Sequence, residues 1–136
     1  IHKDVRQMDG LIESADLAIS AGGMTLYELL LLGTPAIALC SGWPQLRQAR
    51  AFQKRGALVA IDCRRNFEDK ILAQVINHLS AYPRIRHRMI RTGKLLIDGR
   101  GAERVCQYLR KILISENDYM NFARRERAWP YHAHIG

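Results

Sequence analysis

The sequence predicts an α/β fold in which helices cover an open, parallel β-sheet. Three short apolar segments, typical of buried parallel strands, alternate with longer segments whose apolar residues recur at helical spacing. Glycines mark the turns between them: Gly22 and Gly23 follow the first strand, and Gly33 and Gly56 follow the next two helices. Because such alternation joins parallel strands by right-handed crossovers, we expect a doubly wound, Rossmann-like sheet.

The first half of the chain contains two strands and two helices in this prediction. A short helical pattern over Met8–Ser14 leads into the first strand, within Ala15–Ser20. A helix is expected over Thr25–Leu32, because Gly33 follows it where a left-handed C-cap is easiest. The second strand is predicted at Ala36–Cys40.

The second half continues the alternation. A helix is predicted over Gln45–Arg55, and Ala57–Ile61 is the third strand. Phe67–Leu79 repeats apolar residues at helical spacing, and Pro83 separates it from the helix that follows. The last two helices are expected at Ile85–Ile97 and Ala102–Ile114.

The length of 136 residues suits one domain with one core. We assign residues 1–114 to this domain and residues 115–136, which show no clear period, to a C-terminal extension. Three strands are few for a doubly wound sheet, and the chain opens at Ile1 instead of Met. We therefore expect that it begins inside a longer protein and that Ile1–Val5 is the end of a further strand.

The net charge of +8 and the pI near 9.9 suggest an anionic partner. A solvated helix face is the alternative, and an anionic membrane surface or phosphates are the partners considered. Nucleic acid is not expected, because no aromatic residues are interleaved for base stacking. No apolar run approaches the roughly 20 residues that span a bilayer, so a cytoplasmic location is expected. The late basic residues are Arg84, Arg86, Arg88, Arg91, Lys94, Arg100, Arg104, Arg110, Lys111, Arg124, Arg125 and Arg127.

The cysteines and histidines predict neither a metal site nor a cofactor. The pair His132 and His134 has no third ligand nearby in the sequence. The cysteines, expected as buried, reduced thiols without metal-ligand spacing, are Cys40, Cys63 and Cys106. The isolated histidines, expected as surface or helix residues, are His2, His78 and His87.

The turn after the first strand predicts an anion site. Ligands of open parallel sheets bind beyond the carboxyl ends of the strands. Gly22 and Gly23 allow the backbone to approach a ligand closely. The helix that follows, opened by Met24 and Thr25, presents unpaired N–H groups and the positive end of its dipole. Gly22, Gly23, Met24 and Thr25 are therefore predicted to hold a diphosphate.

Glu28 has two interpretations. Thr25 and Glu28 have the spacing of a capping box, in which both side chains bond backbone N–H groups at the helix start. Alternatively, the Glu28 carboxylate accepts hydrogen bonds from two ribose hydroxyls, as acidic residues of dinucleotide folds do. The residues alone leave both interpretations open.

The same segments resemble the C-terminal domain of GT-B glycosyltransferases, of the family 28 type. The resemblance covers about residues 4–110, and within that group it points to the branch of spore-coat polysaccharide and pseudaminic-acid enzymes, which includes a UDP-sugar hydrolase. Its motifs are Gly-Gly-x-Thr-x-x-Glu from Gly22 and Gln-x-x-x-Ala-x-x-Phe-x-x-x-Gly from Gln45. Asp98–Val105 also resembles the end of that branch's proteins.

This resemblance implies a UDP-sugar as ligand and an enzyme that transfers or hydrolyses the sugar. It implies that Gly22 to Thr25 hold the diphosphate, that Glu28 binds the ribose and that Gln45 faces the donor sugar. Relatives usually carry Asp, Glu or Asn just before that glutamine, where this chain has Trp43-Pro44. The catalytic base is expected in an N-terminal domain that this chain does not contain. A sugar-nucleotide epimerase and a non-enzymatic basic interaction domain are the alternatives.

Overall fold

The computed structural model describes residues 7–65 and 67–113. It contains a three-stranded parallel sheet flanked by helices, so the predicted Rossmann-like α/β class is confirmed. The chain divides into two compact units, one ending at Asp98 and the other beginning at Gly99. The segment Ile1–Val5 and residues 115–136, with the His132 and His134 pair, lie outside the described residues.

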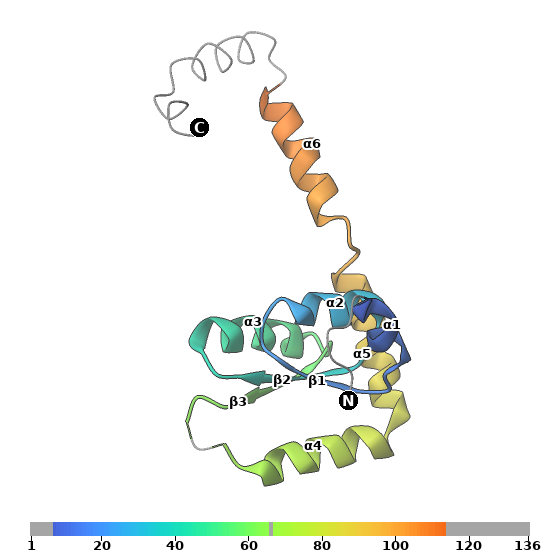
Figure 1. Cartoon of the computed structure of the whole chain (residues 1–136), viewed down its shortest axis with the longest axis vertical. Coiled ribbons are helices and arrows are strands. Elements are labelled where there is room, and N and C mark those ends of the chain that lie inside the picture. The colour runs from blue at the N-terminus through green and yellow to red at the C-terminus, as the bar shows by residue number, and fades with distance from the viewer. Residues whose placement is uncertain (1–6, 66, 114–136) are drawn as a thin grey trace, which may run out of the picture. The chain divides into compact units, whose positions relative to one another are not determined.

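The sheet is built by two strand–helix–strand crossovers (Figure 1). Its order is β1-β2-β3 with all strands parallel, and the crossover helices α2 and α3 follow β1 and β2. The three strands are β1 (Ala18–Ala21), β2 (Ala36–Cys40) and β3 (Val59–Asp62). The helices of the first unit are α1 (Met8–Ser14), α2 (Thr25–Leu32), α3 (Trp43–Lys54), α4 (Asp69–Ala81) and α5 (Pro83–Leu96).

Several elements begin later or earlier than predicted: α4 starts at Asp69 instead of Phe67, α5 at Pro83 instead of Ile85, and the last helix at Gly101 instead of Ala102. For β1, β3 and α3 the reason can be identified. Strand β1 starts at Ala18 instead of Ala15 because its partner β2 starts at Ala36, with which Ala18 pairs. Strand β3 starts at Val59, which pairs with Ile37, because the preceding residues still close the end of α3. Helix α3 starts two residues before Gln45, with Gly42 as its N-cap in an extended conformation.

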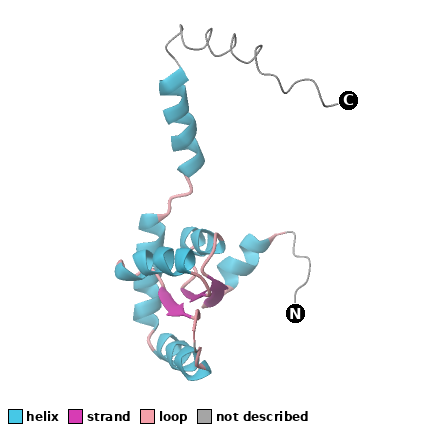
Figure 2. Cartoon of the chain, turned by 90° about the vertical axis from the view of Figure 1, so that its left-hand side faces the viewer, coloured by secondary structure: helices cyan, strands magenta, loops and turns pink. Residues whose placement is uncertain are grey.

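The core has two layers, one on each face of the sheet. Side chains of successive strand residues point to opposite faces. Ala36, Ala38 and Cys40 of β2 therefore pack with α1, α2 and α3, whereas Ile37 packs with α4 and α5. Figure 1 shows α2 and α3 on one side of the strands and α4 on the other, and Figure 2 shows the strands enclosed by these helices.

The second unit contains helix α6 (Gly101–Leu113). Its start is held by an ion pair between Arg100 Nε and Glu103 Oε2 at 2.7 Å. Apolar Val105, Leu109 and Ile112 recur at helical spacing and are exposed. None of the helices in the described part of the chain is long and apolar enough to cross a bilayer.

Candidate functional site

The predicted site residues gather at one edge of the sheet. Because the strands are parallel, their carboxyl ends lie together: Ala21 pairs with Leu39, and Cys40 pairs with Asp62. The turn after β1, the start of α3 and the residues after β3 therefore share this edge. We call it the strand-end edge.

Gly22 is required by packing inside the protein. Its N–H donates to the carbonyl of Leu39 at 3.1 Å and so extends the pairing of β1 with β2. A Cβ at Gly22 would lie 2.9 Å from both Cys40 Sγ and Gln45 Cβ. The missing side chain thus allows the start of α3 to pack against the sheet, and it brings Gln45 beside the turn.

Gly23 differs, because the space above it is open. Its N–H donates to the carbonyl of Ala21 at 2.8 Å within the tight turn. A Cβ at Gly23 would have no atom within 4 Å. The backbone at Gly23 is therefore open to close approach, whereas at Gly22 the space of the missing side chain is filled by Cys40 and Gln45.

The free amides of the turn belong to Met24 and Thr25. Helical bonding starts with Leu26, whose N–H donates to Gly23, and Tyr27, whose N–H donates to Met24. The N–H groups of Met24 and Thr25 donate to no residue in the described part of the chain. These two donors and the α2 dipole therefore form the anion-binding feature, whereas the amides of the two glycines are used within the protein.

The capping-box interpretation of Glu28 is wrong. The N-cap of α2 is Met24, with helical φ −63° and ψ −33°, and no side chain of the described residues caps the helix. Glu28 is exposed in the first turn and bonds to no described residue. Its two carboxylate oxygens are consequently available to a ligand.

Gln45 is held in place by the loop before α3. Its Oε1 accepts hydrogen bonds from the backbone N–H of Ser41 at 3.0 Å and from Ser41 Oγ at 3.2 Å. Since a backbone N–H can only donate, the atom facing it must be the amide oxygen. The Gln45 side chain therefore offers its NH₂ group, a donor, to a ligand.

Three residues of the strand-end edge were missed by the sequence prediction. Asp62 ends β3 and accepts two hydrogen bonds from the Arg64 guanidinium, at 2.8 and 2.7 Å. These hydrogen bonds are the largest cause of the low pKa of Asp62, which is about 2. The guanidinium carbon of Arg64 lies 4.1 Å from the centre of the Trp43 ring, a cation–π contact.

Trp43 borders a hollow at the same edge. The hollow measures about 400 Å³ and is lined by Trp43, Pro44 and Arg47. The Trp43 side chain is 62% exposed although it is a large aromatic residue. An exposed aromatic ring beside arginines is a feature of binding surfaces, and it was signalled in the sequence only by Trp43-Pro44 at the helix start.

The expectation that the three cysteines are buried is wrong for Cys106, which is exposed on α6, although all three are free thiols. Cys40 is buried at the end of β2, and this burial raises the pKa of its thiol. Cys63 is half-buried and its Sγ lies 3.7 Å from the carbonyl of Ile61. In residues 7–65 and 67–113, no group of three His, Cys, Asp or Glu side chains could hold a metal ion.

The chain is similar to one curated protein of polysaccharide biosynthesis. It is 32% identical over 115 residues to the spore coat polysaccharide biosynthesis protein SpsG of Bacillus subtilis (strain 168). The match covers 84% of this chain but 34% of SpsG, so the chain spans about a third of that relative's length. No family model and no solved structure matches the chain. This similarity supports a relationship to proteins of polysaccharide biosynthesis. Membership of glycosyltransferase family 28 stays a prediction.

Proposed function

We propose that this chain is the UDP-sugar-binding part of an enzyme of cell-surface polysaccharide or nonulosonic-acid biosynthesis. The observation that carries the proposal is that the amides of Met24 and Thr25 bond to no described residue and directly follow Gly23, where a Cβ would meet open space. The similarity to a spore coat polysaccharide biosynthesis protein supports the biosynthetic role.

The diphosphate binds at the start of α2. The amides of Met24 and Thr25 donate to its oxygens, and the positive end of the helix dipole adds a favourable charge. Gly23 contributes by having no side chain at the approach. No charged side chain is needed for these contacts, because helix N-termini bind phosphates through the backbone alone.

The nucleoside and the sugar extend from the diphosphate in two directions. Glu28, exposed in the first turn of α2, accepts hydrogen bonds from the two ribose hydroxyls. The NH₂ group of Gln45, oriented by Ser41, donates to an oxygen of the sugar. The choice of uracil over other bases rests on the family resemblance.

The chemistry assigned to this chain is stabilisation of the leaving group. When the bond between the sugar and the phosphate breaks, negative charge grows on the diphosphate. Fixed donors aimed at that charge stabilise the transition state more than the ground state. In this proposal an N-terminal domain of the whole protein supplies the base and the acceptor; a sugar acceptor gives transfer, and water gives the UDP-sugar hydrolysis kept as the alternative.

Calorimetric titration of the chain with UDP, ADP and GDP tests the proposal. We expect UDP to bind more tightly than the other two. Glu28→Ala should weaken UDP binding about tenfold, the loss of about 1.4 kcal/mol that one charge-assisted contact typically supplies. Glu13→Ala, which removes an exposed carboxylate from α1, is the matched control and should leave binding unchanged.

Two results contradict the proposal. Equal, weak binding of all three nucleotides with a steep dependence on salt would favour a non-enzymatic basic interaction domain. UDP binding that is insensitive to Glu28→Ala would remove the ribose contact. On the whole protein, release of UDP from a UDP-sugar with and without a sugar acceptor separates transfer from hydrolysis.

A further inference from the structure

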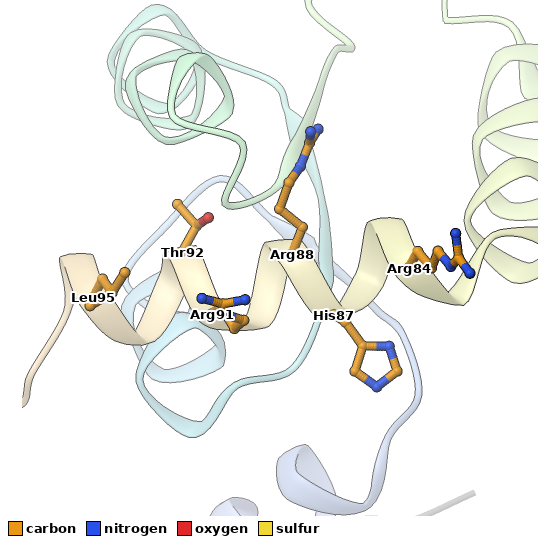
Figure 3. A pocket seen from close by; sticks show the side chains of 6 residues that line it. All are labelled: Arg84, His87, Arg88, Arg91, Thr92 and Leu95. Atoms are coloured by element: carbon orange, nitrogen blue, oxygen red, sulfur yellow. The ribbon is translucent and has the colours of Figure 1, made fainter.

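Helix α5 carries a basic hollow that the proposed function does not use. The hollow measures about 520 Å³, within the range of roughly 300–1,000 Å³ typical of small-molecule pockets. Its lining residues lie three and four positions apart, so they share one face of α5 (Figure 3). They are Arg84, His87, Arg88, Arg91, Thr92 and Leu95. Its three cations, the hollow arginines, are Arg84, Arg88 and Arg91.

The hollow lies away from the strand-end edge. Gly33 and Gly56 precede β2 and β3, and α5 approaches both of them. A Cβ at Gly33 would collide with Lys94 Cε, and one at Gly56 would lie 4.0 Å from Arg88 Nε. Helix α5 therefore runs along the edge where these strands begin, whereas Gly23 is at the edge where strands end. The two sites are separate.

No carboxylate among the described residues balances the positive charge of the hollow. Helix α5 contains no acidic residue, and the hollow arginines pair with no carboxylate in the described part of the chain. Arg86 of the same helix differs, because its guanidinium caps α4 by donating to the carbonyls of Leu79 and Ser80. Like charges three and four residues apart on a helix repel one another, so an anion in the hollow relieves this repulsion.

The donors of the hollow suit a phosphate group. Guanidinium groups match phosphate oxygens with paired hydrogen bonds. His87 Nδ1 lies 2.9 Å from the Pro83 carbonyl, which can only accept, so Nδ1 carries a proton. In a neutral ring Nε2 is then an acceptor, so His87 is not counted among the donors to the phosphate. No Phe, Tyr or Trp is among the described residues that line the hollow, so these residues offer nucleic-acid bases no surface on which to stack.

We propose that the α5 hollow binds a phosphate group, held by the hollow arginines with the Thr92 hydroxyl as a further donor. Leu95, which is 84% exposed, forms an apolar border beside it. The phosphate belongs either to a soluble phosphate ester or to a phospholipid headgroup.

Residue-resolved NMR of the ¹⁵N-labelled chain, titrated with inorganic pyrophosphate, tests this site. We expect saturable shifts of the Arg88 and Arg91 amides. In the double variant Arg88→Gln/Arg91→Gln, the pyrophosphate affinity obtained from these shifts should fall at least tenfold. Lys70→Gln, which removes an exposed cation from α4, is the control and should change nothing. Shifts at Met24 report the proposed nucleotide site separately, so either proposal can fail without the other.

Vesicles identify the source of the phosphate. If the chain binds vesicles that contain phosphatidic acid but not vesicles of pure phosphatidylcholine, and the double variant loses this binding, the ligand is a lipid headgroup. If the chain binds pyrophosphate but no vesicles, the ligand is a soluble phosphate ester. Missing shifts in α5, or equal pyrophosphate affinity in the double variant, overturn the proposal. It is also overturned if a single-stranded oligonucleotide binds through the hollow arginines while pyrophosphate does not, because the partner is then nucleic acid.

Discussion

The guanidinium of Arg64 lies over the ring of Trp43, with 4.1 Å between its central carbon and the ring centre. Two hydrogen bonds to Asp62 hold this guanidinium in place, so the strand end of β3 supports an aromatic residue at the start of α3. The exposed indole is thereby fixed at the strand-end edge without being buried. A fixed aromatic surface loses little entropy when a ligand contacts it.

The Asp62–Arg64 pair predicts an unusually acidic titration. The pKa of Asp62 is lowered from 3.8 to about 2 because its carboxylate accepts hydrogen bonds from Arg64. A lowered pKa in the folded protein stabilises the fold above pH 3.8, and this contribution is lost as the pH falls through about 2. We expect the Asp62 carboxyl carbon to titrate near pH 2 by NMR.

Removal of the arginine supplies the control for that measurement. Arg64→Gln should return the Asp62 midpoint toward 3.8, whereas Arg65→Gln should leave it near 2. An Asp62 midpoint near 3.8 in the unmodified protein would show that the pair is not formed in solution.

The sequence predicted the bounds of some elements but not the contacts at the site. Helix Thr25–Leu32 and its left-handed cap Gly33 were predicted correctly, because Gly in a left-handed C-cap is a local rule. The capping box at Thr25 and Glu28 was wrong, because Met24 already has helical φ and ψ. Met24 adopts a helical conformation directly after the tight turn at Gly23. The spacing of Thr25 and Glu28 carries no information about that turn.

The contact between Trp43 and Arg64 could not be predicted from the sequence. It depends on the register of β2 and β3, in which Cys40 pairs with Asp62. That pairing places the residues after both strands side by side. Strand register is set by the buried faces of the whole sheet, so the short motifs around Trp43 and Arg64 carry no signal for it.

The two glycines of the turn should respond differently to alanine. Gly22→Ala places a methyl group 2.9 Å from Cys40 Sγ and Gln45 Cβ, and overpacking of this kind typically costs about 1–3 kcal/mol of stability. Gly23→Ala meets no atom within 4 Å and should change stability by less than about 0.5 kcal/mol. Urea unfolding measures both values.

Gly23→Ala should affect nucleotide binding although it hardly changes stability. In the stable Gly23→Ala variant the new methyl group stands where the diphosphate approaches, so calorimetry should show weaker UDP binding. Unchanged UDP affinity in this variant would mean that the ligand does not pass over the turn.

Gly93 allows α5 to pack closely against α2. A Cβ at Gly93 would lie 3.0 Å from Leu30 Cδ2 and 3.1 Å from the Leu30 carbonyl oxygen, in the core. Overpacking typically lowers the free energy of unfolding by about 1–3 kcal/mol, and the higher helix propensity of alanine raises it by about 1 kcal/mol. Gly93→Ala should therefore lower the free energy of unfolding by about 1 kcal/mol. Gly10→Ala in α1 meets no atom within 4 Å and should instead raise it in urea unfolding. Equal changes in both variants would exclude a close contact between α5 and α2.

The role of the Met24 amide can be tested without removing any side chain that a ligand needs. Met24 has φ −63°, the value that proline fixes, and its N–H bonds to no described residue. Met24→Pro should therefore fold normally by circular dichroism while losing one of the two proposed diphosphate donors. We expect about a tenfold loss of UDP affinity, the effect of one charge-assisted hydrogen bond. Met24→Ala removes the same side chain, 75% exposed, but keeps the amide and should bind UDP normally. If both variants lose affinity equally, the Met24 side chain makes the contact; if neither does, the diphosphate is not held by this amide.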